Sequence, residues 1–348
     1  MKIQSIYYDN IGIARIILES DSGNEYDIAI DNPRRIAWCS CPFYVFNKIP
    51  CKHILFAMNY LEYDKMVDKT KSLKHLTTGC KTIDNLLGGG IPYGIVTAVF
   101  GEPTTGKTLF GYQSGLSNLA NSNKDTILIE TEGLRDIDTY NILEKFKSRW
   151  NLSSADITKR FKIIHTLGDP KLQSIQKLFQ MFGYMITLEI SKKGKYSIQF
   201  QNTIPTLTPN QLEKTSMIIL DSLTKPVKDS VGSETQNLPA RAQMTERLFG
   251  KLYHIAKVYN IAILVINHAS VNPAVPYGRD LGKPYGGSPV LYNSKYAIGF
   301  LDATSEIKKN TGWGIEARRV RLLRRPDEQT TGQLYPVRLK KDWGFDDS

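Results

Sequence analysis

One complete phosphate-binding motif constrains this chain more than any other feature of its sequence. Residues 101–108 read Gly-Glu-Pro-Thr-Thr-Gly-Lys-Thr, which fits the pattern G-x-x-x-x-G-K-[ST], and the apolar run 95–100 precedes them. In this pattern backbone N–H groups surround the β-phosphate, the lysine binds the β- and γ-phosphates, and the last hydroxyl ligates Mg²⁺. A helix that begins near Gly106 adds the positive end of its dipole. The motif therefore predicts a strand, a loop and a helix that bind a nucleoside triphosphate.

Later apolar runs end in polar residues, as the strands of a nucleotide-binding sheet do. Run 126–129 is followed by Glu130-Thr131-Glu132, and run 217–220 ends at Asp221, a Walker B pattern in which the carboxylate holds Mg²⁺. A carboxylate at the carboxyl end of a parallel strand faces the phosphate loop. We expect an α/β fold with a predominantly parallel sheet covered on both faces. ATP and Mg²⁺ are expected to bind Gly101, Glu102, Pro103, Thr104, Thr105, Gly106, Lys107, Thr108 and Asp221.

Three of the four cysteines lie close together near the start of the chain. Cys39, Cys41, Cys51 and His53 form the pattern C-x-C-x₉-C-x-H. Three thiolates and one imidazole are a soft tetrahedral ligand set that suits structural zinc. The alternative is three unligated buried cysteines, which are common as small hydrophobic residues. We expect Zn²⁺, because a module this small depends on metal to fold.

Residues 1 to 65 resemble the SWIM zinc finger. Two strand-like stretches, 11–18 and 25–30, precede Cys-x-Cys-Pro, and Cys51-Lys52-His53 opens an apolar helical run that extends to residue 61. The resemblance implies a small α+β zinc-finger domain over residues 1–68. Such fingers are associated with DNA or protein contacts, and the sequence does not distinguish between the two.

Residues 69–348 resemble the RadA recombinases and the KaiC-like ATPases. Segment 76–90, which begins Leu-Thr-Thr-Gly and ends Leu-Leu-Gly-Gly-Gly, matches the entry to the core in both families. The resemblance implies a RecA-type ATPase core, in which Glu132 polarises the attacking water and Lys107 binds the phosphates. Strand-like run 260–267 ends at His268, where RadA has a glutamine that senses the γ-phosphate. His268 can still donate a hydrogen bond to phosphate, but it can also titrate.

Two segments correspond to the DNA-binding loops of the recombinases. The first is 224–237, after the Walker B strand, and the second is 271–287, which contains Lys-Pro-Tyr-Gly-Gly, similar to the K-P-x-G-G of RadA. Tyr277 and Tyr285 could stack on the bases of single-stranded DNA, with Arg279 on a phosphate. The alternative is an ordinary long loop. We expect DNA as a partner.

Arg324 and Arg325 stand where KaiC-like proteins carry cationic fingers. We expect one of them to reach the γ-phosphate of a neighbouring subunit, which implies a homo-oligomer. The alternative is contact with the DNA backbone.

The net charge of +11 favours a polyanionic partner. Residues 308–341 include ten basic residues and only three acidic ones. No apolar run approaches the ~18 residues of a membrane span, and the first residues lack the apolar core of a signal peptide. Four cysteines do not make a disulfide scaffold, so we expect a cytoplasmic protein without membrane contact.

Together these patterns predict a RadA paralogue, an ATPase of slow turnover that binds DNA and assists or regulates the recombinase in homologous recombination and repair. A partner would be RadA itself or another paralogue. The alternative is a KaiC-like regulatory ATPase, or an adaptor, that acts on protein partners through the zinc finger. Segments 186–191 and 196–200 alternate in polarity around Lys-Lys-Gly-Lys and predict an inserted β-hairpin of unknown role.

Overall fold

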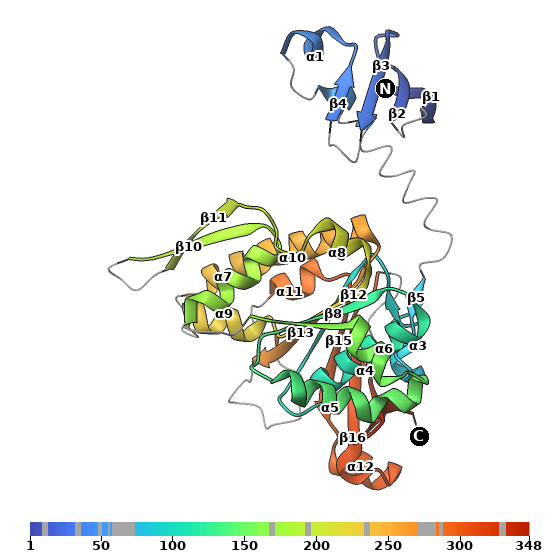
Figure 1. The fold of residues 1–348 in the computed structure, drawn as a ribbon, viewed down its shortest axis with the longest axis vertical. Helices are drawn as coiled ribbons and strands as arrows, with labels where there is room; N and C mark the ends of the chain where they lie inside the picture. Colours follow the sequence, from blue (N-terminus) through green and yellow to red (C-terminus); the bar gives the residue numbers. More distant parts are fainter. Residues whose placement is uncertain are drawn as a thin grey trace. The chain divides into compact units, whose positions relative to one another are not determined.

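The chain forms two compact units, Met1–Leu73 and Lys74–Ser348 (Figure 1). The expected domain boundary at residues 68 and 69 lies outside the described residues. The computed structural model describes residues 1–8, 13–31, 36–47, 51–54, 56–57, 74–166, 171–191, 196–232, 237–270, 283–284, 288–326 and 332–347.

The first unit is an antiparallel sheet of four described strands, in the order β1-β2-β3-β4. The strands alternate in burial, so that Ile16, Leu18 and Ile28 pack on one face with Cys39 and Cys41. The sequence predicted only the two central strands. Helix is present at residues 52–54 and 56–57, and the rest of the predicted helix lies outside the described part. The elements are β1 (Lys2–Tyr8), β2 (Ala14–Glu19), β3 (Glu25–Asp31), β4 (Ile36–Cys39) and α1 (Pro42–Asn47).

A sheet of ten described strands forms the centre of the second unit, in the order β18-β17-β16-β15-β7-β13-β12-β8-β9, with β14 paired to β13. The six neighbouring strands β15, β7, β13, β12, β8 and β9 are parallel to one another. Strands β14, β16, β17 and β18 pair antiparallel with their neighbours. Their bounds are β7 (Val96–Gly101), β8 (Asp125–Glu130), β9 (Phe161–His165), β12 (Thr215–Asp221), β13 (Ala262–Ser270), β14 (Lys283–Pro284), β15 (Tyr296–Asp302), β16 (Ala317–Arg324), β17 (Leu334–Lys340) and β18 (Gly344–Asp346).

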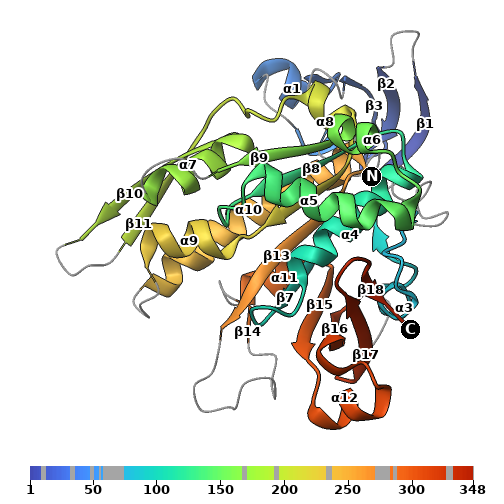
Figure 2. The same ribbon diagram turned by 60° about the horizontal axis from the view of Figure 1, so that its bottom comes forward.

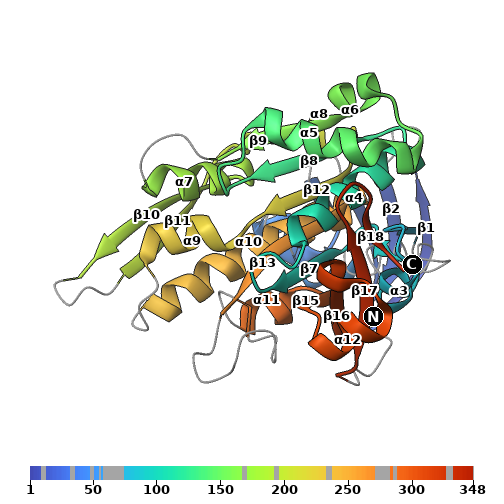
Figure 3. The same cartoon turned by 90° about the horizontal axis from the view of Figure 1, so that it is seen from below.

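Helices cover both faces of this sheet (Figures 2 and 3). The apolar residues of α7, α8, α9 and α10 pack on one face, and those of α3, α4, α5 and α6 pack on the other. The bounds are α3 (Lys81–Leu86), α4 (Lys107–Asn121), α5 (Asp136–Phe146), α6 (Ser154–Arg160), α7 (Lys171–Met181), α8 (Pro209–Glu213), α9 (Thr224–Val231), α10 (Leu238–Tyr259), α11 (Ser288–Asn293), α12 (Ser305–Thr311) and the 3₁₀ turns η1 (Lys147–Trp150) and η3 (Gly314–Glu316).

Parallel pairing aligns the carboxyl ends of the central strands at one edge. Every residue of β12 is buried, as expected for a strand covered on both faces. Asp221 at the end of β12 is in register with Glu130 of β8, and His268 of β13 is in register with Gly101 of β7. Polar residues that are far apart in sequence therefore meet beside the phosphate-binding loop, as the sequence predicts.

The inserted hairpin is confirmed, and it lies against α7 and α10 (Figure 1). Strands β10 (Tyr184–Ile190) and β11 (Tyr196–Asn202) pair antiparallel, while their connection 192–195 lies outside the described residues. A further two-stranded sheet joins β5 (His75–Leu76) to β6 (Ile91–Pro92) before the phosphate-binding loop.

The prediction of a loop over residues 224–237 is wrong in its first half, which is the helix α9. Val227 and Val231 are buried one turn apart, while Lys225 and Asp229 form an ion pair on the outer side. Pro226 lies in the first turn, where its missing N–H costs no hydrogen bond. Residues 233–236 lie outside the described part.

Across the described residues we find no helix with the length and apolarity needed to cross a membrane.

Substitution of Gly115 is predicted to destabilise the ATPase unit, because α4 packs closely on the sheet there. A Cβ atom at Gly115 would lie 2.5 Å from Cε2 of Phe161, whose side chain is fully buried. We expect Gly115→Ala to lower the free energy of unfolding by about 1–3 kcal/mol. The matched control is Gly250→Ala in α10, where a Cβ meets nothing within 4 Å and helix propensity should add roughly 0.5–1 kcal/mol. Urea titration of both variants measures this, and equal effects would contradict the packing argument.

Candidate functional site: a nucleotide site and a metal site

The phosphate-binding loop is shaped by close neighbours at its two motif glycines. A Cβ atom at Gly101 would lie 2.2 Å from the carbonyl oxygen of Phe300, and one at Gly106 would lie 2.6 Å from Cδ2 of Leu339. Gly106 also has φ 96°, in the left-handed region that favours glycine. Strands β15 and β17 thus support the loop from the C-terminal part of the chain. The loop lies between β7 and α4, as predicted.

Lys107 is buried inside this loop, and its ammonium group donates a hydrogen bond of 2.6 Å to the carbonyl oxygen of Glu102. Burial lowers the pKa of Lys107 to about 8, against the opposing effects of the Asp221, Glu132 and Glu102 charges. A phosphate group would add the negative charge that favours the ammonium form. The environment therefore suits a lysine that binds an anion.

Asp221 lies at the carboxyl end of β12 and is fully enclosed. Burial raises its pKa to about 6, a hydrogen bond from the Thr108 hydroxyl acts in the opposite direction, and the Glu132 charge raises it further. A carboxylate and a hydroxyl are hard oxygen ligands of the kind that Mg²⁺ accepts together with water and phosphate oxygens. Thr108 and Asp221 therefore fit the Mg²⁺ role predicted for them.

Glu132 lies in the loop after β8, where two side chains hold its carboxylate. The Ser222 hydroxyl donates to Oε1, and Nε2 of His268 lies 3.3 Å from the same oxygen. Burial opposes the charge on Glu132, but the hydrogen bonds from His268 and Ser222, with nearby positive charge, outweigh it and lower the pKa. Glu132 is therefore ionised and available to accept a proton. Sequence reasoning missed Ser222, although it directly follows the Walker B aspartate.

His268 is itself held by groups that the sequence analysis did not single out. Its backbone N–H donates to Oγ1 of Thr224 at 2.9 Å and to Oδ1 of Asn267 at 3.1 Å. The Thr224 hydroxyl donates in turn to Asn267. Thr224 is the first residue of α9, so the end of β13 is tied to the helix that follows the Walker B strand.

Arg324 and Arg325 bind carbonyl groups of their own chain. Arg324 donates to the carbonyl oxygens of Leu291 and Tyr292 near the end of α11. Arg325 donates to those of Asn85 and Leu86 at the end of α3. Positive charge at the C-terminus of a helix is stabilising. To reach the γ-phosphate of a neighbouring subunit, as predicted, one of these arginines would have to break its hydrogen bonds to a helix end.

Other basic residues of the C-terminal region are also bound within the chain. The ones with a described acidic or carbonyl partner are Lys308, Arg318, Arg319, Arg338 and Lys340. Their charge is thus partly compensated. Of the second expected DNA loop, only Lys283 and Pro284 are described, as β14 paired to the end of β13; Tyr277, Arg279 and Tyr285 lie outside.

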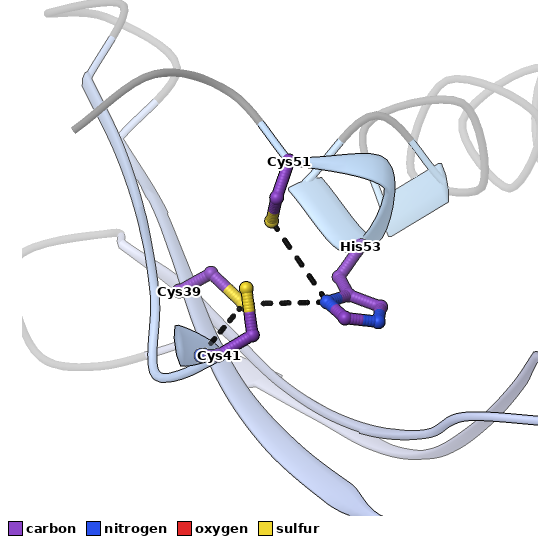
Figure 4. Close-up of side chains that lie close together, drawn as sticks. All are labelled: Cys39, Cys41, Cys51 and His53. Atoms are coloured by element: carbon purple, nitrogen blue, oxygen red, sulfur yellow. Dashed lines mark hydrogen bonds between the residues drawn. The ribbon is translucent and has the colours of Figure 1, made fainter. Parts of the chain in front are cut away.

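The four predicted zinc ligands converge in the first unit (Figure 4). The three Sγ atoms and a ring nitrogen of His53 all lie within 4.8 Å of one another, and all four residues are buried. Nδ1 of His53 is 3.9 Å from the Sγ atoms of Cys39 and Cys51. A tetrahedral zinc site with Zn–S bonds of about 2.3 Å has ligand separations of roughly 3.8 Å. The cluster therefore fits zinc.

Protonation within the cluster is also compatible with metal binding. Burial, together with the charge of Lys52, lowers the pKa of His53, which favours the neutral imidazole that a metal requires. The ring of Tyr26 stacks on that of His53 with centroids 4.4 Å apart, which fixes its plane. Burial raises the pKa of Cys39, and a bound cation would offset this cost by holding the thiolate.

Zinc removal is predicted to unfold the first unit. We expect about one zinc per chain in the purified protein. Cys51→Ala should lose this zinc, because the three remaining donors hold it more weakly. Cys80→Ala is the control, since Cys80 is buried in the second unit and donates to Asp347. Metal analysis of the three proteins provides the measurement. A folded wild-type protein without zinc would contradict the assignment.

Lys107→Ala is predicted to reduce ATP hydrolysis by about 100-fold or more, because it removes the buried positive charge that we expect to bind the β- and γ-phosphates. Lys124→Ala is the matched control, since Lys124 is an exposed lysine beyond the end of α4. Steady-state phosphate release with both variants is the readout. Equal rates in the two variants would place the nucleotide elsewhere.

Comparison with known families agrees with this arrangement. A family model described as the KaiC ATPase matches residues 76–269, and one described as the SWIM zinc finger matches residues 29–62. The first match covers more than half of the chain. The RecA-type core and the SWIM-like module that the sequence predicts are thereby confirmed.

Individual relatives are recombination proteins. The DNA repair and recombination protein RadB of Thermococcus sibiricus is 31% identical over 55% of this chain and 67% of its own length. RadA of Aeropyrum pernix is 23% identical over 62% and 59%. The human meiotic recombination protein DMC1/LIM15 homolog is 25% identical over 75% and 69%.

A solved structure, that of the RadB recombinase, matches with a TM-score of 0.52 at 19% identity, over 78% of this chain and 99% of the other. At this identity the match supports the fold. With the nucleotide site at the carboxyl edge of the sheet and the Cys₃His cluster in the first unit, the chain belongs to the KaiC family of ATPases and joins that core to a SWIM zinc finger.

Proposed function

We propose that the protein is a RadA paralogue, an ATPase of slow turnover that binds DNA and assists or regulates a recombinase in homologous recombination and repair. The observation that carries this is the convergence of Lys107, Asp221 and Glu132 at one edge of the central sheet. The recombination proteins RadB, RadA and DMC1, which are similar in sequence to this chain, support the same function. Single-stranded DNA is its favoured ligand, and RadA or another paralogue is its protein partner.

In this function the residues of the site have separate roles. Lys107 and the N–H groups of the loop bind the phosphates, while Thr108 and Asp221 hold Mg²⁺. Bound Mg²⁺ supplies charge neutralisation on the phosphate oxygens. Glu132 accepts the proton of the attacking water, and the contacts of its carboxylate with Ser222 and His268 hold it in place for this role.

Coupling to DNA has a physical route through His268. The hydrogen bond from its backbone to Thr224 joins β13 to α9, the element after the Walker B strand. The end of β13 also pairs with β14, which belongs to the second expected DNA loop. Binding of DNA to either segment would therefore act on the residue that contacts Glu132.

A KaiC-like regulatory ATPase that acts on protein partners is the second candidate. His268 in place of the family glutamine favours it, and so does the internal pairing of C-terminal basic residues. The first unit also exposes Trp38, Phe43 and Val45, which are suited to contact with a protein.

Single-stranded DNA is predicted to increase the rate of ATP hydrolysis. The reason is that α9 and β14, which follow β12 and β13, are both connected to the strand that carries His268, and His268 contacts Glu132. DNA affinity should fall as salt rises, since counterions are released on binding. The measurement is phosphate release with and without single-stranded DNA at two salt concentrations, with Lys107→Ala as the blank. Hydrolysis that does not respond to DNA would favour the regulatory ATPase.

A further inference from the structure

His165 connects two acidic residues on either side of the loop that carries Glu132. It is the last residue of β9 and is in register with Glu130, the last residue of β8. Nδ1 of His165 lies 3.1 Å from Oε2 of Glu130, and Nε2 contacts Oδ1 of Asp136, the first residue of α5. The connection between β8 and α5 is thus held at both of its ends by one side chain.

Glu130 organises the interior of the same connection. Its side chain is 2% exposed, and Oε1 accepts hydrogen bonds from the backbone N–H groups of Glu132 at 2.6 Å and Gly133 at 2.9 Å. Oε2 accepts a second bond from Gly133 at 3.1 Å in addition to its contact with His165. The carboxylate of Glu130 therefore sets the backbone position of Glu132, and His165 sets the orientation of that carboxylate.

The protonation state of His165 agrees with this arrangement. Both ring nitrogens face carboxylate oxygens, so an imidazolium can donate to both. Burial opposes the charged form, but the hydrogen bonds to Asp136 and Glu130 and the charges of both acids outweigh it and raise the pKa of His165. Hydrogen bonds from a charged donor are shorter and stronger than neutral ones.

We infer that His165 is a positioning residue for ATP hydrolysis, which acts through Glu130 to hold Glu132 at the γ-phosphate. The inference rests on the role proposed for Glu132. His165 itself touches neither the phosphate-binding loop nor Asp221 in any described contact, so its loss should change the rate of the chemical step and leave nucleotide binding intact. A displacement of about 1 Å at a reacting group can cost roughly 100-fold in rate.

The two contacts of His165 can be separated by substitution. In His165→Asn the amide nitrogen takes the place of Nδ1 and keeps the bond to Glu130. In His165→Gln it takes the place of Nε2 and keeps the bond to Asp136. Because Glu130 is the group that binds the Glu132 backbone, asparagine should restore function and glutamine should not.

The test compares these two variants with His165→Ala and with Asp138→Asn. The last is a matched control that breaks the exposed Arg135–Asp138 pair in the first turn of α5. We expect His165→Ala and His165→Gln to lower kcat about 10- to 100-fold with an unchanged Kd for ATP. His165→Asn should recover most of kcat, and Asp138→Asn should match the wild type. An unchanged kcat in His165→Ala, or equal kcat in the Asn and Gln variants, would overturn the inference.

Amide hydrogen exchange gives a readout that does not depend on hydrolysis. The N–H groups of Glu132 and Gly133 donate to Glu130, so their protection should fall in the Ala and Gln variants and persist in the Asn variant. Unchanged protection would overturn the inference even if the ATPase activity is as proposed. Conversely, a wild-type chain that does not hydrolyse ATP above the Lys107→Ala level would contradict both the proposed function and a role of His165 in hydrolysis, even if exchange shows that His165 holds the Glu132 backbone through Glu130.

Discussion

The nucleotide site depends on the burial of opposite charges at the carboxyl edge of a parallel sheet. Burial lowers the pKa of Lys107 and raises that of Asp221, so each group bears a desolvation cost that the other only partly offsets. Bound phosphates would compensate the charge of Lys107, and bound Mg²⁺ would compensate that of Asp221. The arrangement requires β7, β12 and α4 to keep their positions relative to one another. The close packing of α4 on the sheet at Gly111 and Gly115 maintains these positions.

Around this centre, Glu132 and His268 are each held by contacts from neighbouring elements. Ser222 and His268 hold Glu132 from two neighbouring strands, and His268 is bound through Thr224 to α9. On the other side, Glu130 at the end of β8 holds the backbone of Glu132, and His165 of the edge strand β9 contacts Glu130. A movement of α9 or β14 would change the contact between His268 and Glu132, while Glu130 would still hold the backbone of Glu132. This geometry suits an ATPase whose rate responds to a bound partner.

Much of this site could be predicted from the sequence, because its motifs are local. The phosphate-binding loop, Asp221 and the Cys₃His set each have a fixed spacing, and a parallel sheet necessarily brings the strand ends together. The role of His165 could not be predicted, since it depends on β9 pairing with β8, a contact that no spacing encodes. Likewise, the contacts of Arg324 and Arg325 with helix ends could not be predicted, because only the fold places those helix ends beside them. The helix α9 occupies the first half of the loop that the resemblance to the recombinases implies, and its two buried valines form too short a period to predict a helix from the sequence.

The measurement that tests the central claim most directly is ATP binding and hydrolysis by Glu132→Gln. The substitution keeps the size of the side chain and its contacts with Ser222 and His268 while it removes the carboxylate that accepts the proton. The account predicts that the affinity for ATP and Mg²⁺ stays within about twofold and that hydrolysis falls by roughly 100-fold or more. Hydrolysis at the wild-type rate would contradict it, and the attacking water would then need another base.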